Sequence, residues 1–268
     1  EDPQITHLLQ GQLEAEGIAI FTNSPLTQVK IINNRKWVQA GNQVMEADEI
    51  ILVMQRKPNI QGLNLEGVKI AVNSGQIKVN SKLQTTNSQI YAFGGVLGVY
   101  HYPNIAQYQA SIIIKNCLFF SYFKANYDTI PYTIFTNPPL TRIGLTEFQA
   151  KRRYGNDVIV IQDYFKTLSK AQILGETTGF CQIITRRNGK ILGCHCLGIE
   201  AEELIGAIAL AMQNNLKIQD LALIFPPSPS LFEVLSRISQ TWKSQKFERN
   251  KWLNQWLERL LFWRRKWS

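Results

Sequence analysis

The side chains able to carry redox, nucleophilic or metal chemistry are few: 268 residues contain four cysteines and three histidines. No two cysteines form the CxxC or CxxxxC spacing of a redox-active dithiol. Cys194 and Cys196 lie two positions apart in an apolar run, so on a strand they would face the same side. We interpret them as small apolar residues on a buried strand face, the alternative being a thiol pair or soft-metal site. So few cysteines argue against a disulfide scaffold and for a cytoplasmic, reducing compartment.

Glycine-rich phosphate loops are absent from the sequence. Neither GxGxxG nor GxxxxGK[ST] occurs, and the cluster Gly94-Gly95-Val-Leu-Gly98 has the wrong spacing. Apolar periodicity nevertheless predicts a helix over 4–17, and 49–54 (EIILVM) is a continuous apolar run, typical of a strand buried on both faces. Between them we expect short strands at residues 17–22, 26–32, 36–39 and 42–46. This order is typical of the later part of a nucleotide-binding α/β unit, whose first βα turn we expect to have been lost by truncation.

The second half of the chain has a different pattern. After a loop-rich stretch over 57–90, a short strand at 90–93 enters Gly94-Gly95, and a helix is predicted over 104–119. Beyond residue 128 we expect strands at residues 133–135, 157–161, 181–184 and 191–197, and helices at residues 146–153 (with Thr146 as cap) and 200–214. This alternation predicts an α+β unit with an antiparallel sheet.

Five segments in order carry a resemblance to one family: residues 48–59 (DEIILVMQRKPN), 85–96 (TTNSQIYAFGGV), 135–150 (FTNPPLTRIGLTEFQA), 190–205 (KILGCHCLGIEAEELI) and 221–235 (LALIFPPSPSLFEVL). Over about residues 1–238 the sequence resembles the FAD-dependent pyridine nucleotide–disulfide oxidoreductases, such as dihydrolipoamide dehydrogenase, glutathione reductase and mercuric reductase. Each motif alone is weak, and their order makes the resemblance specific.

The resemblance implies a fold and a domain plan. Residues 1–57 would be the C-terminal part of an NAD(P)-binding domain and 58–127 a returning FAD-domain segment. Residues 128–238 would form an α+β dimerisation domain with an antiparallel sheet, followed by an amphipathic tail over 239–268. We therefore expect a homodimer through 128–238, or an N-terminal half supplied separately.

The resemblance also implies a function. In the family, electrons pass from NAD(P)H through FAD to a disulfide or similar acceptor, at active sites on the dimer interface. The segments that carry the main FAD loop, the NAD(P) glycines and the redox-active cysteines would precede Glu1. We expect FAD and NAD(P)H to be cofactors of the complete protein, and this chain to be inactive alone. The alternative is a non-catalytic dimerisation or interaction module.

Several positions depart from the family pattern. Gly95 stands where the family has an aspartate that accepts a hydrogen bond from the flavin ribityl chain, and glycine cannot do so. The backbone of Gly94, Gly95 and Val96 is retained as a candidate FAD contact. Gln55 replaces the glycine of the family's Gly-Arg pair, where a residue with a side chain tolerates a positive φ poorly.

The family's catalytic histidine is also replaced. Its position falls on Ser228, with Glu233 as the carboxylate that would orient a base, and a serine hydroxyl has no useful pKa near neutrality. Glu233 is alternatively a solvated carboxylate near a helix N-terminus. His101 and His195 are candidate replacement bases, although a loop histidine and a strand histidine are the commoner explanations. No metal site is expected.

The tail carries most of the positive charge. After Thr241 there are eight basic residues against two acidic ones, which accounts for six of the nine net positive charges. A helix would place an apolar stripe on one face and basic residues on the rest, with Trp252, Trp256, Trp263 and Trp267 in the stripe and Arg264 and Arg265 outside it. Such a helix is typical of peripheral docking on an anionic membrane surface, the alternative being packing on the same protein or its dimer partner. The near-neutral body argues against a nucleic-acid partner.

Overall fold

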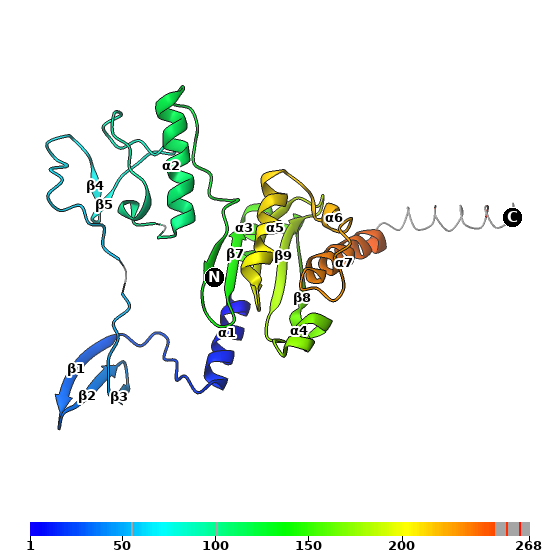
Figure 1. Cartoon of the computed structure of the whole chain (residues 1–268), viewed down its shortest axis with the longest axis horizontal. Helices are drawn as coiled ribbons and strands as arrows, with labels where there is room; N and C mark the ends of the chain where they lie inside the picture. The colour runs from blue at the N-terminus through cyan, green and yellow to red at the C-terminus, as the bar shows by residue number, and fades with distance from the viewer. Residues whose placement is uncertain (55, 100, 250–255, 257–262, 264–268) are drawn as a thin grey trace. The chain divides into compact units, whose positions relative to one another are not determined.

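The computed structural model describes residues 1–54, 56–99, 101–249, 256 and 263. They form two compact units. Unit 1 consists of residues 1–15 and 126–268, and unit 2 of residues 16–125 (Figure 1). The predicted domain boundaries at residues 57, 127 and 238 are assignments by family and stay predictions. No helix among the described residues is both long and apolar enough to cross a bilayer.

Unit 1 is built on an antiparallel sheet with the strand order β6-β7-β10-β9-β8. Its strands are β6 (Tyr132–Ile134), β7 (Leu140–Gly144), β8 (Val158–Tyr164), β9 (Phe180–Arg186) and β10 (Ile191–Leu197). The sheet confirms the predicted mixture of helices with antiparallel strands. Strand β7, which pairs directly with the central strand β10, was not predicted from the sequence.

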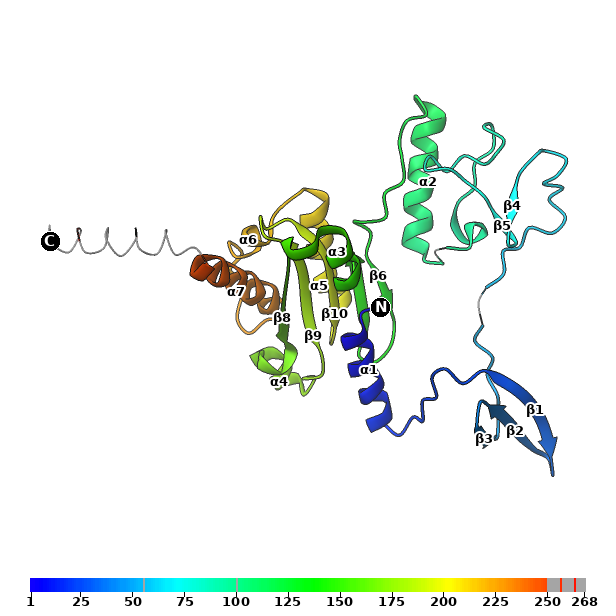
Figure 2. The ribbon, with the colours of Figure 1, turned by 180° about the vertical axis from the view of Figure 1, so that it is seen from behind.

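Helices cover both faces of this sheet (Figures 1 and 2). Their apolar side chains join the strands' side chains in separate core clusters on the two faces. One face carries α4 (Ser169–Leu174), α5 (Ala201–Gln213), α6 (Ile218–Leu221) and α7 (Glu233–Arg249), and the other carries α1 (Pro3–Ala15) and α3 (Glu147–Tyr154).

Because helices cover both faces of the sheet, all seven residues of β10 are buried. Successive strand residues point to opposite faces, so Cys194 and Cys196 join the α5–α7 core while Leu197 joins the cluster of α1. A strand with one face in water would alternate between buried and exposed residues instead.

A local cap begins helix α3, and a long-range contact anchors helix α7. Thr146 caps α3 as predicted: its hydroxyl accepts from the Gln149 backbone N–H, and the Gln149 side chain accepts from the Thr146 N–H. In α7, Trp242 is only 2% exposed, and its Nε1 donates to Thr185 Oγ1 at 3.1 Å. Residues up to Trp242 therefore belong to the folded unit, so the predicted tail over 239–268 begins inside α7.

Unit 2 contains two small structures. A three-stranded antiparallel meander comprises β1 (Leu26–Ile32), β2 (Arg35–Ala40) and β3 (Gln43–Ala47), as predicted. The remaining elements are β4 (Val72–Asn73), β5 (Gln76–Ile77), the 3-10 helix η1 (Gly94–Leu97) and α2 (Pro103–Leu118). Ile70, Ile77, Leu83, Ala92, Leu97 and Ile112 form the core that joins these later elements.

Three strand predictions in unit 2 are wrong. Residues 17–22 form no strand, and of 90–93 only Tyr91 makes a bridge, to Gln84. The EIILVM run is neither a strand nor buried, since Ile51, Leu52, Val53 and Met54 are 67% to 90% exposed. A continuous apolar run predicts a strand with covered faces, and among the described residues of unit 2 no strand pairs with this run.

Candidate functional site

The candidate flavin segment lies in unit 2, where η1 is held against α2. The backbone N–H of Gly94 donates to Gln109 Oε1 at 2.7 Å, so this donor is already engaged. A Cβ on Gly94 would meet the Ala106 Cβ at 3.6 Å. Gly95 is exposed, and the nearest atom to a Cβ placed there, outside its chain neighbours, would be His101 Nδ1 at 3.6 Å. The chain thus presents an accessible backbone at Gly95 with an imidazole beside it, which fits a hydrogen-bonding ligand such as a flavin side chain.

The candidate catalytic pair lies in unit 1, between α6 and α7. Ser228 is exposed. Glu233 is half-buried, and its carboxylate accepts the Ser230 backbone N–H at 3.0 Å, while Ser230 Oγ accepts the Phe232 N–H at 3.1 Å. Both bonds stabilise the turn that leads into α7, so Glu233 has a local structural role at the start of that helix. A catalytic role for either residue stays a prediction.

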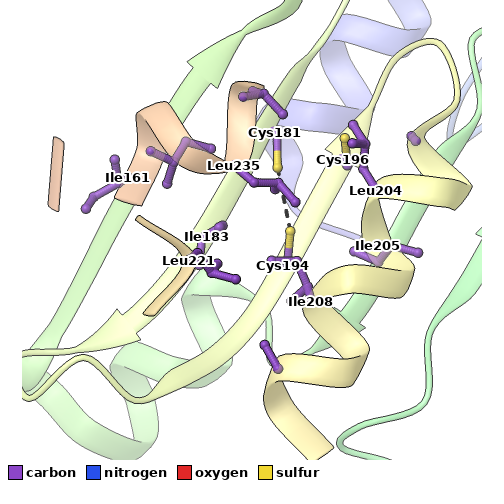
Figure 3. Close-up of a cluster of buried hydrophobic side chains, with 14 of the residues drawn as sticks. Ile161, Cys181, Ile183, Cys194, Cys196, Leu204, Ile205, Ile208, Leu221 and Leu235 are labelled. Atoms are coloured by element: carbon purple, nitrogen blue, oxygen red, sulfur yellow. Dashed lines mark hydrogen bonds between the residues drawn. The ribbon is translucent and has the colours of Figure 1, made fainter. Parts of the chain in front are cut away.

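Three cysteines, not two, meet in the core of unit 1 (Figure 3). Cys194 and Cys196 share a face of β10 as expected, and Cys181 of β9 lies across from them, with its Sγ 3.7 Å from Cys194 Sγ. The contact with Cys181, together with burial, raises the pKa of both Cys194 and Cys196 well above the ordinary thiol range. Among the described residues, no group of three or more potential ligands is placed to hold a metal ion. Cys194 and Cys196 belong, together with Cys181, to the apolar core cluster of that face of the sheet.

His195 occupies the opposite face of β10. It is fully buried, and within the described part of the chain neither ring nitrogen has a hydrogen-bond partner. Arg142 of β7 and Gln182 of β9 stand opposite it across the sheet. Burial, and then the charge of Arg142, lower the pKa of His195, so the ring is neutral at pH 7.

The first two residues of the chain complete this polar cluster. Glu1 pairs with Arg142 at 3.7 Å, and Asp2 Oδ2 accepts the Glu147 backbone N–H at 3.1 Å at the start of α3. These contacts span more than 130 positions in sequence, which is why residue spacing could not reveal them. These contacts attach the N-terminal end of α1 to the sheet and bring the charges of Glu1 and Asp2 near the buried His195.

The remaining candidates are the two histidines and the residues of the tail. His101 lies in unit 2 and His195 in unit 1, and each stays a prediction as a base. Trp256 and Trp263 are exposed, at 48% and 62%. Trp252, Trp267, Arg264 and Arg265 lie outside the described residues.

The sequence matches two family models in chain order. Residues 1–112 match "Pyridine nucleotide-disulphide oxidoreductase", and residues 130–238 match "Pyridine nucleotide-disulphide oxidoreductase, dimerisation domain". The chain belongs to the pyridine nucleotide–disulphide oxidoreductase family. The second match covers the antiparallel sheet of unit 1 and helices α3 to α6, and the family's members are FAD- and NAD(P)H-dependent flavoproteins.

Relatives within the family agree with this assignment. A mercuric reductase of Staphylococcus aureus is 33% identical over 250 residues, 90% of this chain and 45% of that protein. A dihydrolipoyl dehydrogenase of Bacillus subtilis is 28% identical over 243 residues, 88% of this chain and 51% of that protein. The HOCl-induced flavoprotein disulfide reductase of Escherichia coli, as its Cu(II) complex, matches with a TM-score of 0.82 and 26% identity, over 90% of this chain and 55% of that one. The chain therefore spans about half the length of the relatives it matches.

The buried His195 makes the stability of unit 1 depend on pH. An unfolded histidine has a pKa of about 6.5, and the folded value lies below it. The unfolded state therefore takes up the proton first. Stability is fully present above about pH 6.5 and is lost as the pH falls from there toward the folded pKa, by at most about 1.4 kcal/mol per pH unit.

We expect the urea midpoint of unit 1 to fall between about pH 7.5 and pH 5.5. His195→Gln removes the titrating group and should flatten this dependence, whereas His7→Gln, which changes an exposed histidine of α1, should leave it intact. Equal pH dependence in wild type and His195→Gln would show that His195 is not its source.

Proposed function

We propose that this chain is the C-terminal half of a flavin-dependent oxidoreductase that passes electrons from NAD(P)H through FAD to a disulfide or similar acceptor. The observation that carries the proposal is the match of both family models, in order, on a chain that spans half of its relatives. The sequence contains neither GxGxxG nor CxxxxC, so a further polypeptide part would supply the phosphate-binding loop and the dithiol.

In that assembly, bound FAD supplies hydride acceptance and onward electron transfer. This chain's own residues contribute binding surface and positioning. The η1–α2 region, fixed by the bond between Gly94 and Gln109, presents Gly95 toward a ligand. Ser228 offers no group that titrates near neutrality, and Glu233 is engaged with the Ser230 N–H, so a proton acceptor at this site would come from elsewhere in the assembly.

The exposed EIILVM run supports the need for a covering part. Four adjacent apolar side chains, Ile51 to Met54, are mostly in contact with water, as expected for a strand that lacks its sheet neighbours. We infer that the part of the assembly that supplies the nucleotide loops also covers this run. The chain alone should consequently aggregate more readily than the assembly.

The absorption spectrum tests the proposed function directly. We expect the purified chain with added FAD to show no protein-bound visible flavin band that NAD(P)H bleaches, and we expect such a band once an N-terminal half from a relative is co-expressed with it. A bleachable flavin on the chain alone would show that its own segments suffice. No flavin in either case would favour the non-catalytic dimerisation module.

We further propose that a second copy of the chain covers an apolar surface of unit 1. Leu223, Ile224 and Phe225, between α6 and α7, are exposed by 68%, 42% and 88%. An uninterrupted apolar patch of this kind marks an interface, and it lies within residues 130–238, which match the dimerisation-domain model. The position of Ser228, three residues further on, would bring it to the same interface.

A single substitution in this surface tests whether it is the dimer interface. Phe225→Ser should weaken self-association by about ten-fold or more, because buried aromatic residues dominate interface energies. Phe148→Ser is the matched control, since Phe148 on α3 is 72% exposed and lies outside this surface. Sedimentation equilibrium gives the dissociation constants. Dimers that respond to Phe148→Ser and not to Phe225→Ser would place the interface elsewhere.

Peripheral membrane docking is the second candidate function. Trp256 and Trp263 are exposed, and the sequence after Arg249 has five basic residues against one acidic residue. Exposed indoles together with a basic segment fit the headgroup region of an anionic bilayer. A test has to preserve Trp242, because its burial and its bond to Thr185 make it part of the core.

We expect removal of residues 250–268 to reduce binding to phosphatidylserine-containing vesicles by at least ten-fold, since each basic residue near the surface contributes about 1 kcal/mol. Binding by the full chain should weaken as salt is added and should be absent on phosphatidylcholine vesicles. Trp256→Ser with Trp263→Ser keeps the charge and separates the aromatic contribution. Unchanged binding after truncation would rule out docking by the tail.

A further inference from the structure

Gly95 differs from the glycines on either side of it. Gly94 and Gly98 have φ values of +74° and +68°, a left-handed conformation that side chains rarely adopt, so both positions require glycine. Gly95 is not among the residues with positive φ. The one atom that its Cβ would meet within 4 Å is His101 Nδ1, at an ordinary contact distance of 3.6 Å. Neither the backbone nor the packing therefore demands a glycine at position 95.

The missing side chain leaves open space beside His101. This histidine is exposed and lies in the segment between η1 and α2. Within the described residues its ring has no hydrogen-bond or ion-pair partner. A neutral imidazole carries one N–H donor and one acceptor nitrogen, so it can bond a ligand hydroxyl in either direction.

The backbone on both sides of this space is fixed by contacts within unit 2. The Gly94 N–H bond to buried Gln109 fixes the start of η1 on α2, and Leu97 is buried in the core of the same structure. Pro103 at the first turn of α2 limits the backbone just after His101. The packing of η1 and α2 thus fixes the backbone on both sides of the segment that carries His101.

We propose that His101 supplies the hydrogen-bonding group that position 95 lacks, by bonding a hydroxyl of the flavin's ribityl chain. The inference rests on the proposed flavin function and assigns one further binding residue to it. A ribityl chain is a row of hydroxyl groups, each of which both donates and accepts, and the imidazole's ring nitrogens can bond such a hydroxyl. Gly95 leaves the ligand free to approach from the accessible side.

The experiment measures FAD affinity of the complete assembly, by recovery of flavin fluorescence on release. His101→Ala should raise the dissociation constant about five-fold, as expected for the loss of one neutral hydrogen bond. Gly95→Asp in the same protein should restore binding to within about two-fold, because the backbone accepts a side chain there and a carboxylate accepts the same hydroxyl. His7→Ala on α1 is the matched control and should bind as wild type does.

Each outcome either supports or overturns the assignment of His101 as a flavin-binding residue. A weakened His101→Ala variant rescued by Gly95→Asp, with unchanged circular dichroism and melting temperature, supports the assignment. Equal affinity in His101→Ala and wild type overturns it while leaving flavin binding intact. Weakening that Gly95→Asp does not rescue also overturns it, because His101 would then act through the loop. An assembly that binds no FAD at all overturns the proposed function and this assignment together.

Discussion

Burial of the central strand on both faces is the constraint on which unit 1 depends. Since β10 has helices above and below, each of its side chains must be stable without water. The cysteines meet this requirement as protonated, apolar-like groups, and His195 meets it by remaining neutral. Loss of either helical layer would expose half of the strand. The arrangement therefore requires α5 and α7 on one side and α1 and α3 on the other.

Local patterns in the sequence predicted much of this unit. The cap at Thr146, the shared face of Cys194 and Cys196, and the antiparallel sheet all depend on residues close in the chain or on strand alternation. Prediction was wrong for the EIILVM run, where strand formation requires neighbours that unit 2 does not provide. The strand β7 was missed because it follows two prolines and has the polar, buried Thr141 beside the buried Leu140, so that its side chains do not alternate between apolar and polar.

The candidate site shows a different limit. Each of the five motifs was weak alone, but their order along the chain was enough to predict the family. A shared order of five segments requires a match over most of the chain. It did not indicate that Glu233 accepts the Ser230 N–H, or that His101 lies against Gly95. The first contact was hidden because the same residue spacing serves both capping and catalysis. The second lies between a 3-10 helix and an α-helix, where no periodicity relates residue 95 to residue 101.

Unit 1 is discontinuous, since unit 2 is inserted between α1 and the rest of its fold. A ribosome adds roughly 5–20 residues per second, so α1 would emerge many seconds before β10, the strand that its apolar face covers. During that interval Ile5, Leu8 and Leu9 have no native partner, and a nascent chain would present them to chaperones. The unit that carries the family's dimerisation fold can be completed only after the inserted unit has been synthesised. The time at which unit 1 can fold therefore depends on the order of translation as well as on its own stability.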